Sequence, residues 1–143
     1  MSELDKRQEE IIEEFAFFDD WMEKYAHLIE QGKSLTLVDD GFKTKDNVIK
    51  GCQSKVWIEA AESKGILKLK GDSDSSIAKG IVALVLRVLS DLKVDDVLNA
   101  DLYFIEKTGL NEHLSPSRSN GLSSMIKQVK LYALVYKQKS LLS

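Results

Sequence analysis

The chain has 143 residues, of which 43% are hydrophobic and 30% charged, as expected for one globular domain that buries a core without disulfides. Its formal net charge of −3 argues against a general nucleic-acid-binding protein. The longest apolar run, Ile81 to Leu86, is too short to span a bilayer, and the acidic N-terminus resembles neither a signal nor a transit peptide. We therefore expect one cytoplasmic domain over residues 1–143, with no membrane and no nucleic-acid partner.

Charge is distributed unevenly along the chain. Residues 1–31 carry ten acidic and three basic side chains, whereas the residues from Ser115 onward carry five basic and no acidic ones. Two interpretations are open. The charges either cover the solvated faces of helices or form a docking surface that steers a partner by its sign.

The first third of the chain predicts two helices and an irregular connection. Apolar residues recur with helical spacing over residues 4–18. Asp20 followed by Glu23 predicts the N-terminal cap of a second helix that ends near Gly32. Residues 33–47 have no helical period, which favours an irregular connection.

The middle of the chain predicts an antiparallel hairpin. Residues 56–60 alternate in the period-2 pattern of a half-buried strand, and residues 66–72 place Leu67 and Leu69 on one face. Residues 63–65 (SKG) predict the turn between them. A strand near residues 48–50 or 35–38 could join the hairpin, so we expect about three strands.

The second half of the chain predicts mostly helix. Residues 77–89 are nearly apolar all round, which indicates a helix at the centre of the core. Two short helices are expected near residues 94–100 and 102–107, and a final helix is expected to begin near Pro116. The expected fold class is therefore α+β, with helices packed on a small antiparallel sheet.

The chain contains one cysteine, Cys52, placed after Gly51 and just before the first predicted strand. Its thiol has no internal disulfide partner, and an inert thiol, a nucleophile and a carrier are all open. A Cys–His enzyme would require His27, or His113 in a short loop, to fold beside Cys52. The three residues lack zinc-ligand spacing, and an iron–sulfur cluster usually needs about four thiolates. We expect no bound metal and no cofactor.

Three blocks together indicate a family. The segments IKGCQSKVWIEA, GDSDSSIAKGIVALV and LSPSRSNGLSSMI resemble, in order and spacing, the signature blocks of the SufE family of sulfur-acceptor proteins. The N-terminal pattern W-x-x-KY-x-x-LIE-x-G also fits, and the resemblance covers roughly residues 8–130. The close paralogue CsdE shares these blocks, so the resemblance does not separate the two subfamilies.

The resemblance implies an α+β fold similar to the IscU/NifU scaffold proteins and a function as a sulfur carrier. Members accept sulfane sulfur from a PLP-dependent cysteine desulfurase of the SufS or CsdA type and stimulate that enzyme. They hold the sulfur as a persulfide on the cysteine matching Cys52 and deliver it to iron–sulfur assembly proteins such as the SufBCD complex. PLP then belongs to the partner. The alternatives are a cluster scaffold, a regulatory partner that carries no sulfur, or a self-sufficient Cys–His hydrolase or peroxidase.

The resemblance also implies roles for other residues. Arg118 in the PSRS block would stabilise a persulfide anion or brace the cysteine loop. Asp72 and Asp74 in GDSD would lie beside that loop and dock a partner, or one of them would cap the following helix. The loop itself would be shaped by Gly51, Gln53 and Ser54. Because solvent nucleophiles remove persulfide sulfur, we expect Cys52 to be turned into an apolar recess at rest.

Overall fold

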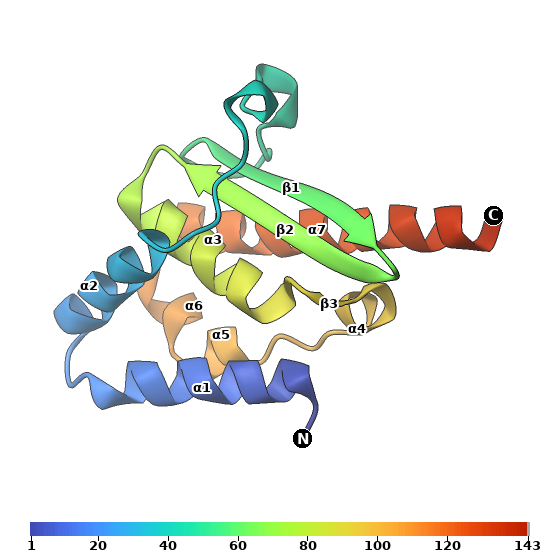
Figure 1. The fold of residues 1–143 in the computed structure, drawn as a ribbon. Coiled ribbons are helices and arrows are strands. Elements are labelled where there is room, and N and C mark those ends of the chain that lie inside the picture. The colour runs from blue at the N-terminus through green and yellow to red at the C-terminus, as the bar shows by residue number, and fades with distance from the viewer. Residues whose placement is uncertain (143) are drawn as a thin grey trace.

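In the computed structural model, which describes residues 1–142, an antiparallel sheet lies in front of two helices (Figure 1). The strand order is β1 (Val56–Ser63), β2 (Ile66–Ser73), β3 (Leu92–Lys93), and the two helices are α3 (Ser76–Leu89) and α7 (Pro116–Leu142). The predicted α+β class is confirmed. The elements in chain order are α1 (Glu3–Phe17), α2 (Trp21–Gly32), the 3₁₀ turns η1 (Asp40–Phe42) and η2 (Lys45–Asn47), β1 (Val56–Ser63), β2 (Ile66–Ser73), α3 (Ser76–Leu89), β3 (Leu92–Lys93), α4 (Val94–Leu98), α5 (Phe104–Lys107), α6 (Leu110–His113) and α7 (Pro116–Leu142).

The predicted hairpin is confirmed, with β1 and β2 paired from Val56–Ser73 to Ser63–Ile66. Lys64 and Gly65 form the two-residue turn, and both have positive φ, as the tight hairpin turns matching strand twist require. This register sets one face of β1 and β2 toward the helices. The other end of the hairpin, where β1 begins, lies next to Cys52.

The prediction of an earlier third strand is wrong. Strand β3, Leu92–Lys93, pairs with Ile66 and Leu67 after the chain returns from α3. The two candidate segments each make a single backbone hydrogen bond to the hairpin, from Ile49 to Val56 and from Gly71 to Thr36. A two-residue strand shows no alternation, so the sequence pattern could not identify β3.

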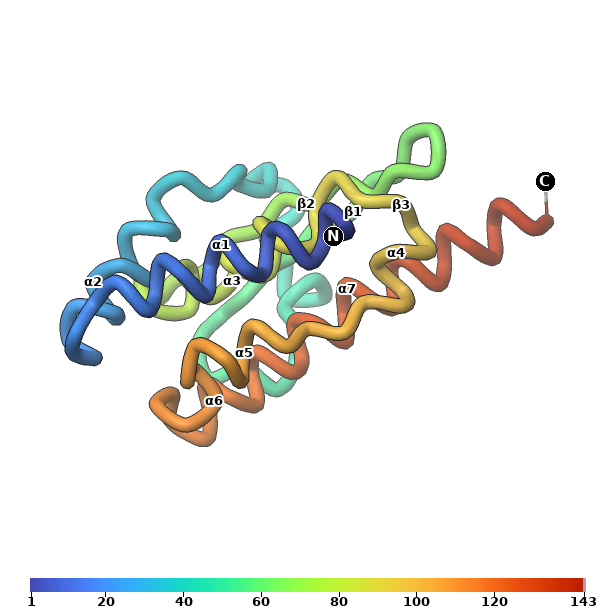
Figure 2. The backbone as a smooth tube through the Cα atoms, turned by 90° about the horizontal axis from the view of Figure 1, so that it is seen from below, coloured from blue at the N-terminus to red at the C-terminus, as the bar shows by residue number. Residues whose placement is uncertain are grey.

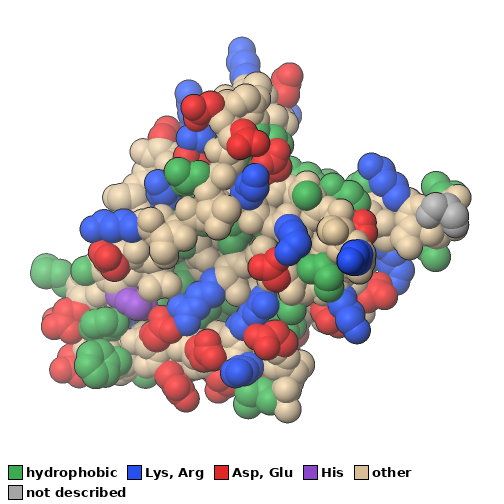
Figure 3. All heavy atoms as spheres, in the orientation of Figure 1, with side chains coloured by type: hydrophobic (Ala, Val, Ile, Leu, Met, Phe, Trp, Pro, Cys, Tyr) green, Lys and Arg blue, Asp and Glu red, His purple; other side chains and the backbone are tan. Residues whose placement is uncertain are grey.

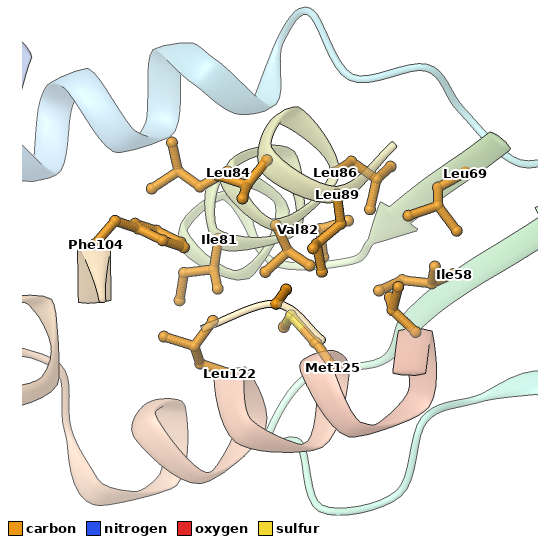
Figure 4. Close-up of a cluster of buried hydrophobic side chains, with 14 of the residues drawn as sticks. Ile58, Leu69, Ile81, Val82, Leu84, Leu86, Leu89, Phe104, Leu122 and Met125 are labelled. Carbon is orange, nitrogen blue, oxygen red and sulfur yellow. The ribbon is translucent and has the colours of Figure 1, made fainter. Parts of the chain in front are cut away.

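Helix α3 is the centre of the core, as its nearly continuous apolar sequence predicts. Its side chains pack toward β1 and β2 on one side, for example against Ile58 and Leu69, and toward Leu122 and Met125 of α7 on the other (Figure 4). The described helix begins at Ser76, because the Ser75 side chain accepts a hydrogen bond from the Ala78 amide at 3.4 Å.

Helices α2 and α3 cross at very close range. A Cβ atom on Gly80 would lie 2.8 Å from the carbonyl carbon of Leu28 and closer still to its oxygen. A Cβ atom on Gly32 would lie 3.0 Å from the Gly80 amide nitrogen. Gly32 ends α2 as predicted, and it also provides half of this contact. The crossing therefore depends on the absence of two side chains.

The remaining helices follow the predictions with one correction. Asp20 caps α2, since its Oδ1 accepts from the Glu23 amide at 2.9 Å. Helix α7 begins at Pro116 as predicted. His113, however, is the last residue of the short helix α6 and not part of a loop, because Gly109 (φ +81°) redirects the chain and Leu110 is buried.

The surface reflects the uneven charge of the sequence. Acidic side chains gather along the lower edge of the molecule over α1 (Figure 3). Helix α7 continues past the rest of the chain at its C-terminal end (Figure 2). Within residues 1–142, no helix combines the length and apolarity needed to cross a membrane.

Candidate functional site

The loop that carries Cys52 runs from Ile49 to Val56 and is closed by a 2.9 Å hydrogen bond from the Ile49 amide to the Val56 carbonyl. Gly51 has φ +93°, in the left-handed region that favours glycine. A Cβ atom there would lie 2.5 Å from Oγ of Ser124 in α7. The loop therefore packs directly against α7 at Gly51, just before Cys52.

Cys52 is partly buried and packs against the core cluster. It lines a small recess of about 10 Å³. The inner wall comes from β1, α3 and α7, and the rim comes from the loop and the start of α7; the other lining residues are Gln53, Ser54, Val56, Ala78, Ile81, Ser117, Arg118, Gly121 and Met125. Cys52 was expected to be turned into an apolar recess, and its side chain does line one and packs on the core, although it is only partly buried.

The surroundings of the thiol keep it neutral at rest. Burial raises the pKa of the Cys52 thiol above its ordinary value. Its polar contact is a weak one, with Sγ 3.7 Å from the Gly121 carbonyl oxygen. The free protein thus presents a protonated thiol beside apolar side chains.

The GDSD turn holds the base of the cysteine loop. Asp74 Oδ1 accepts from the Lys55 amide at 3.0 Å, and the Ser73 hydroxyl donates to the Lys55 carbonyl at 2.8 Å. The predicted position of GDSD beside the loop is therefore correct. The alternative role of Asp72 or Asp74 as a helix cap is wrong, because Ser75 caps α3.

Asp72 is the buried member of an ion-pair cluster with two partly exposed lysines, and it does not line the recess. It is 6% exposed, pairs with Lys43, and has Oδ1 3.5 Å from Lys79 Nζ and 2.8 Å from the Ser73 amide. Burial by itself would raise the pKa of this carboxyl. The hydrogen bonds from Lys43 and Ser73 and the charges of Lys43 and Lys79 outweigh burial and lower it.

We expect Asp72→Asn to lower the free energy of unfolding by about 2 kcal/mol at pH 7, since it leaves Lys43 and Lys79 without their carboxylate. A carboxyl whose pKa is lowered by folding stabilises the fold above its unfolded pKa of about 3.9, and that contribution is lost as the pH falls through the lowered value. The difference between variant and wild type should therefore shrink in acid.

Urea unfolding at pH 7 and in acid checks this expectation. Asp40→Asn is the matched control. The Asp40 carboxylate also faces Lys43, but it is fully exposed and its contact with Lys43 is long, at 4.0 Å. An Asp72→Asn variant as stable as Asp40→Asn at pH 7 would contradict the role assigned to the cluster.

Arg118 lies at the rim of the recess, where the resemblance places it. It is partly buried, its backbone amide donates to Ser115 Oγ at 3.3 Å, and its guanidinium has no ion-pair or hydrogen-bond partner within residues 1–142. A cation without a carboxylate partner is available to an anion in the recess. Gln53 is exposed and Ser54 partly buried at the same rim.

Neither histidine contacts Cys52 in the described part of the chain, so the structure does not assemble a Cys–His pair. His27 Nε2 lies 3.1 Å from Glu14 Oε1. The His113 ring stacks on Trp21 with 3.9 Å between ring centres. Among residues 1–142, no three His, Cys, Asp or Glu side chains are placed to hold a metal ion.

From the sequence, no site role was assigned to the residues that α7 contributes to the recess wall. Gly121 and Met125 come from α7, about seventy residues after Cys52, and they form part of the recess wall. Gly121 lies within the quoted block LSPSRSNGLSSMI, but a glycine inside a helix indicates a close approach without naming its partner.

Comparisons with known proteins agree with this geometry. A family model described as SufE, Fe–S metabolism associated domain, matches residues 9–133. The solution structure of a hypothetical protein from Thermus thermophilus is similar, with a TM-score of 0.75 and 19% identity over 96% of this chain and 97% of that one. At this identity the likeness shows the fold alone. The family match covers most of the chain, and the protein therefore belongs to the SufE family, whose domain is associated with iron–sulfur metabolism.

Proposed function

We propose that this protein is a sulfur carrier that takes sulfane sulfur from a cysteine desulfurase onto Cys52 and passes it on for iron–sulfur cluster assembly. The observation that carries the proposal is the position of Cys52. The single thiol of a SufE-family chain lines a recess next to Arg118, whose guanidinium has no partner among residues 1–142. The donor would be a PLP-dependent enzyme of the SufS or CsdA type and the later acceptor a complex of the SufBCD type, both in the cytoplasm, where thiols stay reduced.

The transfer is a displacement at sulfur, related to thiol–disulfide exchange. The Cys52 thiolate attacks the terminal sulfur of the donor's persulfide, a new S–S bond forms, and the donor's S–S bond breaks. The donor cysteine leaves as a thiolate with the electron pair, so no oxidant is needed. A second thiol nearby would attack the new persulfide and release its sulfur, so a solitary cysteine suits a carrier.

The partial burial of Cys52 in the free protein supports a thiol that is shielded from solvent until a donor is bound. Burial keeps Cys52 protonated and turned toward the core. Transfer then requires the loop from Ile49 to Val56 to move outward and the thiol to ionise. Such a loop opens the site only when the donor is bound and shields it from water at other times, as loops do at other reactive sites. We propose that the desulfurase docks on the surface around Cys52, the GDSD turn and Arg118. The Arg118 guanidinium would stabilise the thiolate or persulfide anion of Cys52.

Alkylation of Cys52 is expected to depend on pH. In the free protein, the rate should rise with pH through a value above that of an ordinary cysteine, because burial raises the thiol pKa. With the desulfurase bound, the rise should occur at lower pH. The measurement is the rate of iodoacetamide modification followed by mass spectrometry. A free-protein profile shifted below that of a model cysteine peptide would mean that the thiolate is already activated at rest.

The proposed function is tested by desulfurase turnover. Adding the protein should raise the rate at which a SufS-type enzyme releases alanine from cysteine, because the carrier removes the product sulfur. A cluster scaffold would instead bind iron and develop cluster absorbance, and a peroxidase would consume peroxide without any partner. No stimulation at saturating concentration would contradict the carrier function.

A further inference from the structure

We propose that a groove along α1 binds an extended segment of another protein that is rich in lysine or arginine and carries one apolar anchor. Two hollows, of about 470 and 420 Å³, meet at Glu10, which lines both of them. Together they form the α1 groove. The first reaches Glu3 near the start of the helix, and the second reaches Phe17 and Phe18 at its end, where α2 turns back (Figure 1).

The α1 groove follows one side of its helix. The α1 residues along it recur every three or four positions, as residues on one helical face do: Glu3, Arg7, Glu10, Glu14 and Phe17. This side of the helix is about 20 Å long at about 1.5 Å per residue. It therefore has room for about six residues of extended chain.

The charge of the α1 groove is negative. Five carboxylates and two guanidiniums line it, which gives a formal charge of −3. Both guanidiniums are bound within the protein, since Arg7 donates to three backbone carbonyls at the C-terminal end of α3 and Arg87 donates to Glu14. The Glu10 side chain, by contrast, is 52% exposed, and Glu13 is exposed beside it. A lysine or arginine side chain of a partner complements these carboxylates.

The second hollow offers an apolar contact at the end of the groove. Phe17 is 81% exposed, and its ring lies edge-on to that of Phe18, with 5.4 Å between ring centres. The Phe18 ring is in turn 5.1 Å from the ring of His27. An exposed aromatic side chain beside a hollow is typical of the anchor positions of protein interfaces. The bound segment should therefore place an aromatic or aliphatic side chain here.

The first hollow favours an extended segment over a helix. The hydroxyls of Ser34, Thr36 and Ser90 line it and can bond to the backbone of an extended chain. A helix has already paired most of its backbone groups internally. Nucleic acids and anionic lipids are repelled by the negative charge of the groove. No residue lines both the groove and the Cys52 recess, so a partner held in the groove leaves the thiol accessible to a sulfur donor or acceptor.

Binding of a synthetic peptide tests the proposal. The probe is a fluorescein-labelled peptide of about nine residues, in which lysine alternates with serine and phenylalanine stands near one end. One matched peptide has serine in place of the phenylalanine, and another has glutamate in place of every lysine. Fluorescence anisotropy should give a dissociation constant below about 1 mM for the probe and a value at least about tenfold higher for both matched peptides.

The position of the bound probe follows from NMR of the protein. We expect the amide chemical shifts that change to lie in α1 and in residues 27–36, and those of the loop from Ile49 to Val56 to stay unchanged. Cys52→Ser should bind the probe like the wild type. The outcome is therefore independent of whether Cys52 carries sulfur.

Two variants with matched controls separate the apolar anchor from the charge. Phe17→Ser should weaken binding of the probe at least about tenfold. Met22→Ser is its control, because Met22 is 82% exposed on α2 but does not line the groove. Glu13→Gln should weaken binding about threefold and make it less sensitive to salt. Glu112→Gln, an exposed position in α6, should leave binding unchanged.

Equal affinity of Phe17→Ser and Met22→Ser for the probe would overturn the proposal. So would equal affinity of the wild type for the probe and for the peptide without phenylalanine, shift changes centred on the cysteine loop, or no binding at about 1 mM. Light scattering checks the occupant. A wild type that is dimeric and a Phe17→Ser variant that is monomeric would mean that a second copy fills the groove, which also contradicts the proposal.

Discussion

Replacing Cys52 by serine is expected to abolish stimulation of a SufS-type desulfurase while leaving binding to the enzyme intact. A serine hydroxyl is not ionised near neutral pH and does not take sulfur from a persulfide, since the nucleophile in such exchanges is a thiolate. The substitution is nearly isosteric, and the thiol makes only the weak 3.7 Å contact with the Gly121 carbonyl. The free energy of unfolding should change by less than about 1 kcal/mol.

Two measurements on the same samples separate the carrier from a regulator that carries no sulfur. Alanine release reports stimulation, and titration calorimetry reports binding. Alkylation of wild-type Cys52 blocks the thiol in a second way and should also abolish stimulation. A Cys52→Ser variant that binds and still stimulates would show regulation without sulfur transfer. Loss of binding would instead assign Cys52 to the docking contact.

Gly80→Ala is expected to lower the free energy of unfolding by about 3 kcal/mol, as overpacking does in well-packed cores. Helix propensity alone predicts the opposite, a gain of about 1 kcal/mol for alanine over glycine in a helix interior. The reversal arises because the new Cβ would overlap the backbone of Leu28, which cannot rotate away as a side chain would. Helices α2 and α3 would have to separate.

Gly41→Ala is the control for this substitution. A Cβ atom on Gly41 would have no neighbour within 4 Å, so we expect a change within about 0.5 kcal/mol. Urea unfolding of both variants gives the comparison at one temperature and pH. A Gly80→Ala protein as stable as the wild type would mean that the two helices do not cross as closely as described.

The parts of the fold that the sequence predicted are those with a period or a local signal. The apolar run of α3, the cap at Asp20 and the turn at Lys64-Gly65 each depend on neighbouring residues, and all three were correct. Strand β3 is too short to have a period, and its pairing with β2 depends on where the chain returns after α3. The need for a glycine at position 80 follows from the nearby backbone of Leu28, which only the three-dimensional structure shows.

The sequence predicted which segments contribute to the candidate site but not how their side chains are arranged. The family resemblance brought together the blocks around Cys52, GDSD and Arg118, and the structure places these blocks side by side. The resemblance could not distinguish the structural role of Asp72 from that of Asp74. Asp72 pairs with Lys43, which lies outside every quoted block, and Asp74 holds the loop through a backbone amide. Both roles depend on long-range packing that leaves no local pattern.

The central claim, that Cys52 receives sulfur from a partner enzyme, is tested most directly by intact mass spectrometry after incubation with a SufS-type desulfurase and cysteine. We expect a gain of one sulfur atom that is mapped to Cys52, removed by a reductant and absent from Cys52→Ser. The claim is contradicted if the wild type gains no sulfur while the desulfurase turns over, or if Cys52→Ser gains as much as the wild type.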